Sequence, residues 1–197
     1  MSQNRRKFLS IAALTSGAMS LSGNLFAGNR LKEEEYDLPS SISNLKPMVD
    51  GIVPISIEER KQRIAKAQEL MAKEKIDAIF LEGTASSFYF TGMRWGQSER
   101  TFGLVIPASG AIAYVCPKFE EDRAMELINP VFGDEVRCWE EHESPFALIA
   151  GIVKDRGVKH KRIGMEERVR FFIADGVKKA APGFEIVDAT PITAGCR

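Results

Sequence analysis

The chain has 197 residues, of which 44% are hydrophobic and 27% charged, a composition typical of one globular domain with extensions. Its 27 Lys and Arg residues balance its 27 Asp and Glu residues, so the formal net charge is zero. Such a balance gives no electrostatic reason to bind a phosphate backbone, and we expect no nucleic-acid partner. Cys116, Cys138 and Cys196 are widely spaced, so neither a disulfide framework nor a structural zinc site is indicated.

The first 27 residues have the features of a twin-arginine (Tat) signal peptide in the right order. The pair Arg5-Arg6 is followed at the expected offset by Phe and Leu, and then by an uncharged, weakly apolar run over 11–26. This run is too short and too interrupted for a permanent membrane span. With a small residue for cleavage at Ala27, we expect a mature chain that starts near Gly28, in the periplasm or outside the cell.

Residues 28–55 are polar and marked by prolines, and we interpret them as a linker or N-terminal extension. A helix is predicted to open at Ser56, because Ser56 and Glu59 have the spacing of a capping box. Its hydrophobic residues recur near helical spacing and predict one stripe that faces a core: Ile57, Ile64, Ala67, Leu70 and Met71.

From residue 76 onward, short apolar runs alternate with helical patterns. Strands are predicted over 76–81, 102–106, 111–116, 136–139, 162–165 and 184–187. Helices are predicted over 118–127, 144–156 and 169–180, the second of them capped by Ser144 with Pro145 at its first position. The turn residues 107–110 predict a hairpin. The pattern therefore predicts an α/β domain over 56–197, with a mixed β-sheet and helices on both faces.

The motifs of common catalytic sites are absent from the sequence. It contains no H-E-x-x-H, G-x-S-x-G, P-loop or G-x-G-x-x-G pattern. The two histidines, His142 and His160, lie in an acidic loop and a basic turn, and neighbours on an extended chain point to opposite sides. We therefore predict no catalytic residue and no metal ligand in this chain, since a two-metal hydrolytic centre needs clustered ligands.

Residues 87–100 are rich in aromatic residues and arginines, and we interpret this segment as a turn with glycines that allow close backbone approach. Phe88 and Phe90 are assigned to the core. Arginine and tryptophan in a loop are typical of an interface anchor or a ligand clamp. On that ground three residues are the candidate contacts: Arg94, Trp95 and Arg100.

The same segment resembles a known family. Residues 88–92, Phe-Tyr-Phe-Thr-Gly, resemble the YLTG/YFTG motif in the N-terminal domains of creatinase, prolidase and aminopeptidase P. The resemblance continues through four further stretches and covers residues 54–197: 101–107, 117–124, 139–145 and 163–167. Each short motif is weak by itself, and their common order and spacing carry the resemblance.

The resemblance implies a two-domain metallopeptidase that cleaves the bond before proline. Its C-terminal domain would hold two divalent metal ions, usually manganese, cobalt or zinc. Its N-terminal domain would help to form a dimer or tetramer and place loop residues near a neighbouring active site. Arg94 and Trp95, with Arg100 behind them, are then implied contacts to substrate or to the partner subunit. Residues 189–197 look like the connector into the catalytic domain, so no family metal ligand is carried over.

We therefore expect the non-catalytic N-terminal domain of an exported Xaa-Pro aminopeptidase or dipeptidase, in a truncated or split chain. Its partners would be a second copy or a catalytic domain and, through the parent enzyme, proline-containing peptides. The alternative is a stand-alone binding or assembly module that pairs with a full-length relative. An exposed apolar patch would favour the truncated or split chain, and a polar surface would favour the stand-alone module. A third and weaker alternative is an unrelated α/β enzyme.

Overall fold

The computed structural model describes residues 39–197, and the chain divides into two units at residues 52 and 53. The described part of the first unit contains the short helix α2 (Ser40–Ser43). The predicted signal peptide lies outside the described residues, as does the first part of the predicted linker. Within residues 39–197, no helix combines the length and the apolar character needed to cross a membrane.

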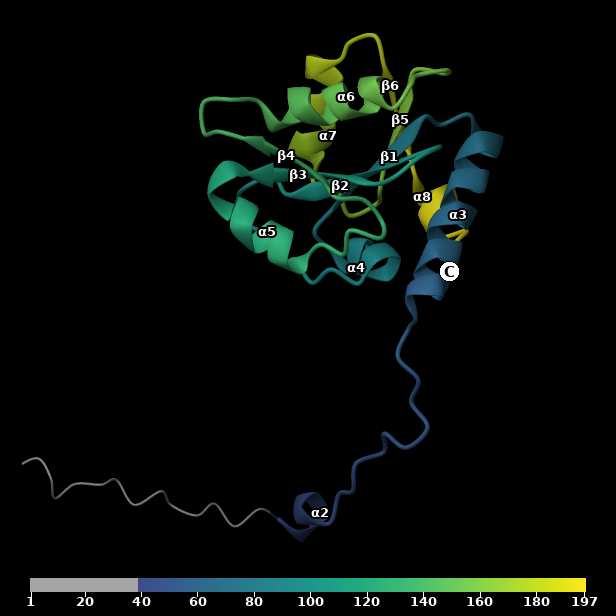
Figure 1. Ribbon diagram of the computed structural model, residues 1–197, viewed down its shortest axis with the longest axis vertical. Helices are drawn as coiled ribbons and strands as arrows, with labels where there is room; N and C mark the ends of the chain where they lie inside the picture. Colours follow the sequence, from purple (N-terminus) through teal and green to yellow (C-terminus); the bar gives the residue numbers. More distant parts are fainter. Residues whose placement is uncertain (1–38) are drawn as a thin grey trace, which may run out of the picture. The chain divides into compact units, whose positions relative to one another are not determined.

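The unit formed by residues 53–197 is a mixed sheet covered by helices (Figure 1). Its strands are β1 (Ala78–Glu82), β2 (Gly103–Pro107), β3 (Ala113–Pro117), β4 (Glu135–Trp139), β5 (Arg162–Met165) and β6 (Glu185–Asp188). Its helices are α3 (Ile57–Glu74), α4 (Ala85–Thr91), α5 (Glu121–Leu127), α6 (Pro145–Asp155), α7 (Phe171–Ala180) and α8 (Thr190–Thr193). A 3₁₀ turn, η1 (Lys118–Glu120), precedes α5.

The strand order is β4-β3-β2-β1-β5-β6. Strand β2 is antiparallel to both of its neighbours, which confirms the hairpin predicted at residues 107–110. The pairs β3–β4, β1–β5 and β5–β6 are parallel. Every strand except β2 therefore ends at the same edge of the sheet, and this is the edge at which open α/β sheets bind their ligands.

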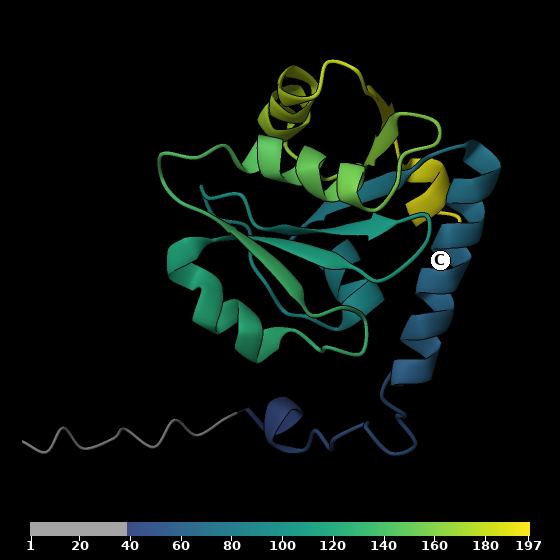
Figure 2. The ribbon, with the colours of Figure 1, turned by 45° about the horizontal axis from the view of Figure 1, so that its top comes forward.

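Two apolar layers hold the helices against the sheet, because alternate residues of a strand face opposite sides. Leu81 and Leu104 pack in one apolar layer with side chains from α3, α4, α5 and α8. Phe80 and Val105, one position along the same strands, face α6 and α7. Figure 2 shows these two helix groups on opposite sides of the sheet. The predicted α/β fold with helices on both faces is confirmed.

The predicted N-caps at Ser56 and Ser144 are confirmed, the first with a correction, whereas α5 and α7 begin three and two residues after the predicted starts at 118 and 169. The Ser56 hydroxyl accepts a hydrogen bond from the Glu59 N–H at 3.1 Å, and the Ser144 hydroxyl accepts one from Ala147 N–H at 3.2 Å. The predicted capping box at Ser56 is only half formed, because the Glu59 carboxylate pairs with Arg63 one turn later. The predicted apolar stripe also begins later than Ile57, which is 42% exposed.

Residues 85–91, which we interpreted partly as a turn, form the helix α4. Thr84 caps it: its Oγ1 accepts from Ser86 N–H at 3.3 Å, and its own N–H donates to Ser87 Oγ at 3.0 Å. Gly92 ends the helix in the left-handed region, at φ 77°, and donates to the Phe88 carbonyl at 2.8 Å. Two turns are too short to show a hydrophobic period, which explains why the sequence pattern missed this helix.

Candidate functional site

An open groove lies where β1 ends, between α4 and the loop that follows it. Its volume is about 420 Å³, and its walls are formed by Thr84, Ala85, Phe88, Met93, Arg94, Trp95 and Gly96. The walls are largely apolar, and one cation, Arg94, stands among them. The groove therefore offers a positive charge beside an apolar surface, a combination suited to a small group that carries both an apolar body and a carboxylate.

Arg94 is exposed at this groove, with its guanidinium carbon 5.5 Å from the centre of the Phe88 ring. A second guanidinium, that of Arg60 on α3, lies 5.1 Å from the same ring. Phe88 is half-buried, so its assignment to the core holds only in part, whereas Phe90 is fully buried as predicted. Both guanidinium groups lie within the range of cation–π attraction. This attraction helps to hold the Phe88 ring in place as one wall of the groove.

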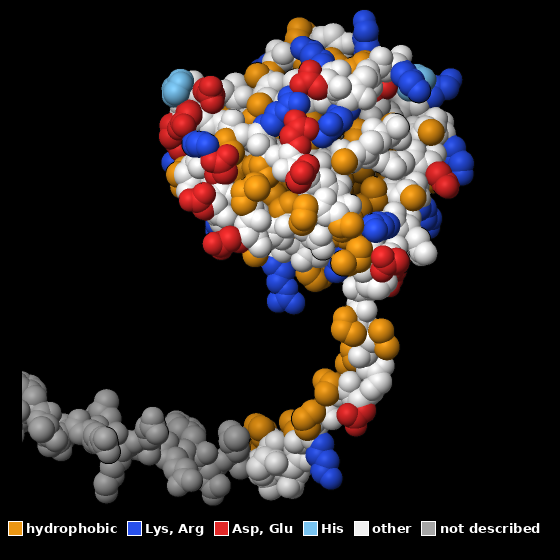
Figure 3. All heavy atoms as spheres, in the orientation of Figure 1, with side chains coloured by type: hydrophobic (Ala, Val, Ile, Leu, Met, Phe, Trp, Pro, Cys, Tyr) orange, Lys and Arg blue, Asp and Glu red, His pale blue; other side chains and the backbone are white. Residues whose placement is uncertain are grey.

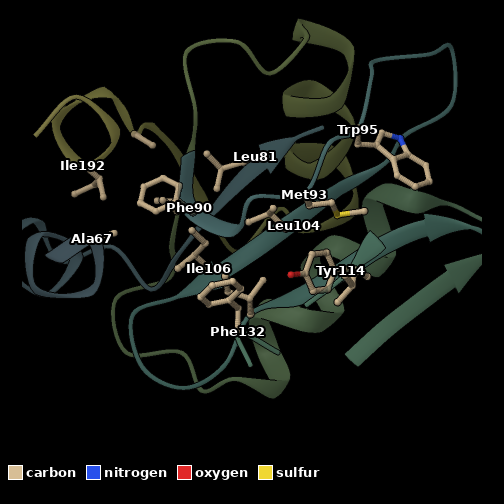
Figure 4. Close-up of a cluster of buried hydrophobic side chains, with 14 of the residues drawn as sticks. Ala67, Leu81, Phe90, Met93, Trp95, Leu104, Ile106, Tyr114, Phe132 and Ile192 are labelled. Atoms are coloured by element: carbon tan, nitrogen blue, oxygen red, sulfur yellow. The ribbon is translucent and has the colours of Figure 1, made fainter. Parts of the chain in front are cut away.

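Trp95 is packed into the protein rather than displayed on it, with 8% of its surface exposed. Its indole is stacked on Phe102, with ring centres 3.7 Å apart, and the Arg123 guanidinium lies 4.4 Å from the indole. Figure 4 shows Trp95 at the margin of the core cluster, away from Phe90 and Ile192. Trp95 thus anchors the loop to the core and also lines the groove. Its contact with a ligand or partner stays a prediction.

Arg100 lies outside the groove. Its Nε is 2.9 Å from Glu141 Oε1, and its guanidinium lies 5.8 Å from the centre of the Phe119 ring. Among the three candidate contacts, the structure therefore brings Arg94 and Trp95 together and places Arg100 at a separate surface position.

Two arginines of α3 hold the end of α4, and the sequence analysis missed both. Arg60 donates to the carbonyls of Phe88 and Tyr89, the latter at 3.0 Å, and Arg63 donates to the Tyr89 carbonyl at 2.8 Å. Burial, followed by the neighbouring charge of Arg63, lowers the pKa of Arg60. Arginines three residues apart lie on the same face of a helix, and this spacing can be seen in the sequence. The spacing does not show which carbonyls the two arginines bind.

A buried ion pair fixes the loop from the other side. Glu82, at the end of β1, is 1% exposed, and its Oε1 accepts from Arg170 Nε at 3.0 Å and Nη2 at 2.7 Å. Gln97 donates to Glu82 Oε2 at 3.1 Å, and Arg170 donates to the Ser98 carbonyl at 2.6 Å. The loop that carries Arg94 is therefore tied to the sheet by polar contacts at residues 97 and 98.

A second buried carboxylate positions the start of α4. Glu166 follows β5 and is 2% exposed, and its Oε1 accepts from Ser86 Oγ at 2.6 Å. Burial raises the pKa of Glu166, against the opposing effect of the hydrogen bonds from Ser86 and the Arg168 N–H. Arg197 donates to the same Ser86 hydroxyl at 3.1 Å. These contacts join α4, β5 and residue 197 around one buried acid.

The resemblance assigns its two metal ions to a catalytic domain, not to the residues that the structure describes. Within 39–197, no group of three or more His, Cys, Asp or Glu side chains is placed to hold an ion. His142 and His160 are exposed, in the loop and the turn where the sequence analysis put them. We assign no step through a metal to these residues.

Comparison with known proteins places this arrangement in a family. The Creatinase/Prolidase N-terminal domain family matches residues 63–197. The chain belongs to this family. An uncharacterised peptidase of Schizosaccharomyces pombe is 31% identical over 172 residues, which are 81% of this chain and 36% of the yeast protein.

Solved structures of the family have the same fold. The dipeptidase PepE from Mycobacterium ulcerans matches with a TM-score of 0.62 and 23% identity, over 70% of this chain and 36% of the PepE chain. The N-terminal domain of the Xaa-Pro dipeptidase from Lactobacillus brevis matches with a TM-score of 0.56 and 21% identity, over 68% of this chain and 98% of that domain. This chain thus spans about one third of the length of PepE and of the yeast relative, and nearly the whole of the isolated domain.

Proposed function

We propose that this chain is the non-catalytic N-terminal domain of an exported Xaa-Pro peptidase, in which it takes part in oligomerisation and limits the access of substrate. The observation that carries the proposal is the groove beside α4, lined by Phe88 at the start of the motif over 88–92, by Thr84 and Ala85, and by the loop residues 93–96. The family membership and the names of the relatives, a peptidase and two dipeptidases, support it.

In this proposal Arg94 binds the carboxylate of a short peptide or an acidic side chain of a partner subunit. It is exposed beside the Phe88 ring, and no carboxylate among residues 39–197 is paired with it, so its charge is available to an incoming group. Phe88 and Trp95 then supply an apolar wall beside that charge. Arg100 would contact the partner subunit from its separate position beside Glu141.

The catalytic residues and the two divalent metal ions, manganese, cobalt or zinc, are proposed to belong to a catalytic domain with which this domain works. Export through the Tat pathway to the periplasm or the cell exterior is proposed from the sequence, in which Arg5-Arg6 is followed by the apolar run over 11–26 and by Ala27. Exposed apolar side chains favour an interface: Phe119, Met125, Leu127 and Val131 lie on or next to α5. Figure 3 shows apolar side chains set between acidic and basic ones on one face of the unit, as at the rim of a protein interface.

The first test is to purify the native product, measure its intact mass and assay the preparation for cleavage of Xaa-Pro peptides with added Mn²⁺, Co²⁺ or Zn²⁺. We expect Xaa-Pro peptidase activity in the native product or in a protein that copurifies with it. An oligomer that contains this chain but has no such activity would instead support the stand-alone assembly module.

The second test uses Arg94→Ala in the active preparation. We expect KM for short Xaa-Pro peptides to rise about tenfold, the equivalent of about 1.4 kcal/mol, with little change in kcat. Arg94→Lys keeps the charge and should recover part of the affinity, and Lys154→Ala removes an exposed charge from the end of α6 as a control. An unchanged KM and an unchanged oligomeric state in Arg94→Ala would exclude Arg94 from both roles.

A further inference from the structure

Two of the three cysteines are neighbours in the sheet. Strands β3 and β4 are parallel, and their register pairs Cys116 directly with Cys138. Paired residues on adjacent strands have Cα atoms about 4.7–4.9 Å apart, which lies within the range of about 4.4–6.8 Å found for disulfides. Both side chains also pack against the same apolar layer, so they point to the same side of the sheet.

The two thiols differ in exposure. Cys116 is fully buried, whereas Cys138 is half-buried on β4, which is an edge strand. Cys116 Sγ donates to the neighbouring Pro117 carbonyl at 3.2 Å, and, besides burial, Glu121 of α5 is near enough to raise the pKa of both thiols. Strand β4 is paired on one side only, and the disulfide requires a local movement that brings the two Cβ atoms to about 3.5–4.5 Å.

The third cysteine belongs to another part of the fold. Cys196 follows α8, and its Sγ lies 3.8 Å from the Arg63 carbonyl of α3. Figure 1 shows α8 and α3 at the end of the sheet away from β4. The register therefore selects Cys116 and Cys138 from the three possible pairs.

We propose that Cys116 and Cys138 form a modification site, at which a disulfide closes between β3 and β4 on reaction with a low-molecular-weight disulfide such as oxidised glutathione. This inference does not depend on the proposed function. The disulfide would tie the edge strand β4 to β3 and enclose η1 and α5 in a covalent loop.

The reaction has two exchange steps. The Cys138 thiolate, the more exposed of the two, attacks one sulfur of oxidised glutathione, and the first glutathione leaves as a thiolate. The Cys116 thiolate then attacks Cys138 Sγ in the mixed disulfide; the Sγ–Sγ bond forms and the second glutathione leaves. Two electrons pass to the oxidant, and the two protons lost by the cysteines are available to the two glutathione thiolates.

The surroundings of the pair make this reaction slow at neutral pH. Burial raises the pKa of Cys116 to about 12, with further increases from Cys138, Glu120 and Glu121. Burial and Glu121 raise the pKa of Cys138 to about 11, and Lys118 opposes them. Because the thiolate is the attacking form, the test is made at alkaline pH, where its fraction is larger.

The experiment uses the full chain, folded and reduced, incubated with oxidised glutathione at pH 8.5, quenched with acid, denatured and alkylated. We expect two of the three thiols to disappear, a peptide map that joins the segments of Cys116 and Cys138, and recovery of all three thiols with dithiothreitol. The variant Cys196→Ser should still lose two thiols, and Cys138→Ser, if circular dichroism shows it folded, should not.

The wild-type peptide map decides the question by itself if Cys138→Ser does not fold. Three alkylated thiols after prolonged oxidation would overturn the proposal, as would a disulfide that contains Cys196. A product that stops as a glutathione adduct on Cys138 would also overturn it, because the second exchange step would then be absent.

Discussion

Three residues fix the position of the Trp95 indole: an aromatic ring, an arginine and a glycine. Phe102 stacks on one ring face, the Arg123 guanidinium contacts the ring, and Gly83 leaves the space that the indole fills. A Cβ at residue 83 would lie 2.6 Å from Trp95 Cδ1 and 3.0 Å from its Cβ, closer than van der Waals contact allows. The glycine that directly follows β1 therefore determines where the tryptophan and its loop can lie.

The variant Gly83→Ala should displace Trp95 and loosen the loop. We expect the free energy of unfolding to fall by about 1–3 kcal/mol, the usual cost of overpacking a tight site. Trp95 should become more accessible, seen as a red shift of tryptophan emission and stronger quenching by acrylamide.

Gly96→Ala is the matched control in the same loop, because a Cβ at residue 96 meets no atom within 4 Å. It should change stability by no more than about 0.5 kcal/mol. If both variants behave alike, the fit between Gly83 and Trp95 is not what holds the loop.

Glu166 makes stability depend on pH in a predictable direction. Its pKa is raised in the folded protein, mainly by burial, so the folded state binds its proton more tightly than the unfolded chain does. Its contribution to stability is therefore fully present below the unfolded pKa, about 4.3, and is lost as the pH rises through the folded value.

The variant Glu166→Gln should remove this dependence. Glutamine stays neutral at every pH, and its amide can accept from the Arg168 N–H and donate to the Ser86 hydroxyl. Urea unfolding between pH 4.5 and pH 7.5 should show a smaller loss of stability with rising pH than in the wild type. An equal loss in both proteins would show that another group dominates.

At the scale of the elements, β1, α7 and the candidate loop meet at one ion pair. Glu82 ends β1, Arg170 precedes α7, and both contact the loop through Gln97 and the Ser98 carbonyl. Because Glu82 is buried, its charge depends on Arg170 for compensation. The order of the loop, and with it the position of Arg94, should therefore depend on this pair.

The variant Arg170→Ala should lower the free energy of unfolding by roughly 2 kcal/mol or more, since it leaves a buried carboxylate without its partner. This expected loss is smaller than for a fully buried ion pair, because the Arg170 side chain is 30% exposed. Chemical denaturation measures the change, and Arg168→Ala, two positions earlier, is the control for loss of a positive charge.

The double variant Glu82→Gln, Arg170→Ala separates charge from packing. If the unpaired charge causes the loss, the double variant should be more stable than Arg170→Ala, because the buried group no longer needs a counter-ion. A double variant that is less stable than the single one would point to lost packing instead.

At the scale of the whole molecule, the proposed export is open to a direct test. Replacing Arg5-Arg6 with Lys-Lys should leave the protein in the cytoplasm of its host, because the paired arginines are the feature that the Tat route reads. Cell fractionation and the intact mass of the product measure export and cleavage near Gly28. Arg30→Lys, beyond the predicted signal, is the matched control, and export that continues in the Lys-Lys variant would refute the proposal.

The α/β class, the order of the strands along the chain and the caps at Ser56 and Ser144 were predictable from the sequence, because each rests on local spacing. The helix α4 was not, since a two-turn helix shows no period and depends on a cap by Thr84 and on arginines from α3. The candidate site was predicted in part: Arg94 and Trp95 share the groove, and Arg100 does not.

The sequence by itself determined the six strands and the longer helices, and the family to which the motif at 88–92 points, whereas the short helices α2, α4 and α8 were not predicted. Tertiary structure alone decided that Trp95 is buried, that Glu82 meets Arg170 and that Cys116 lies beside Cys138. Each of these facts depends on contacts between residues distant in the chain. Local propensities do not encode the strand order or the register that brings such residues together.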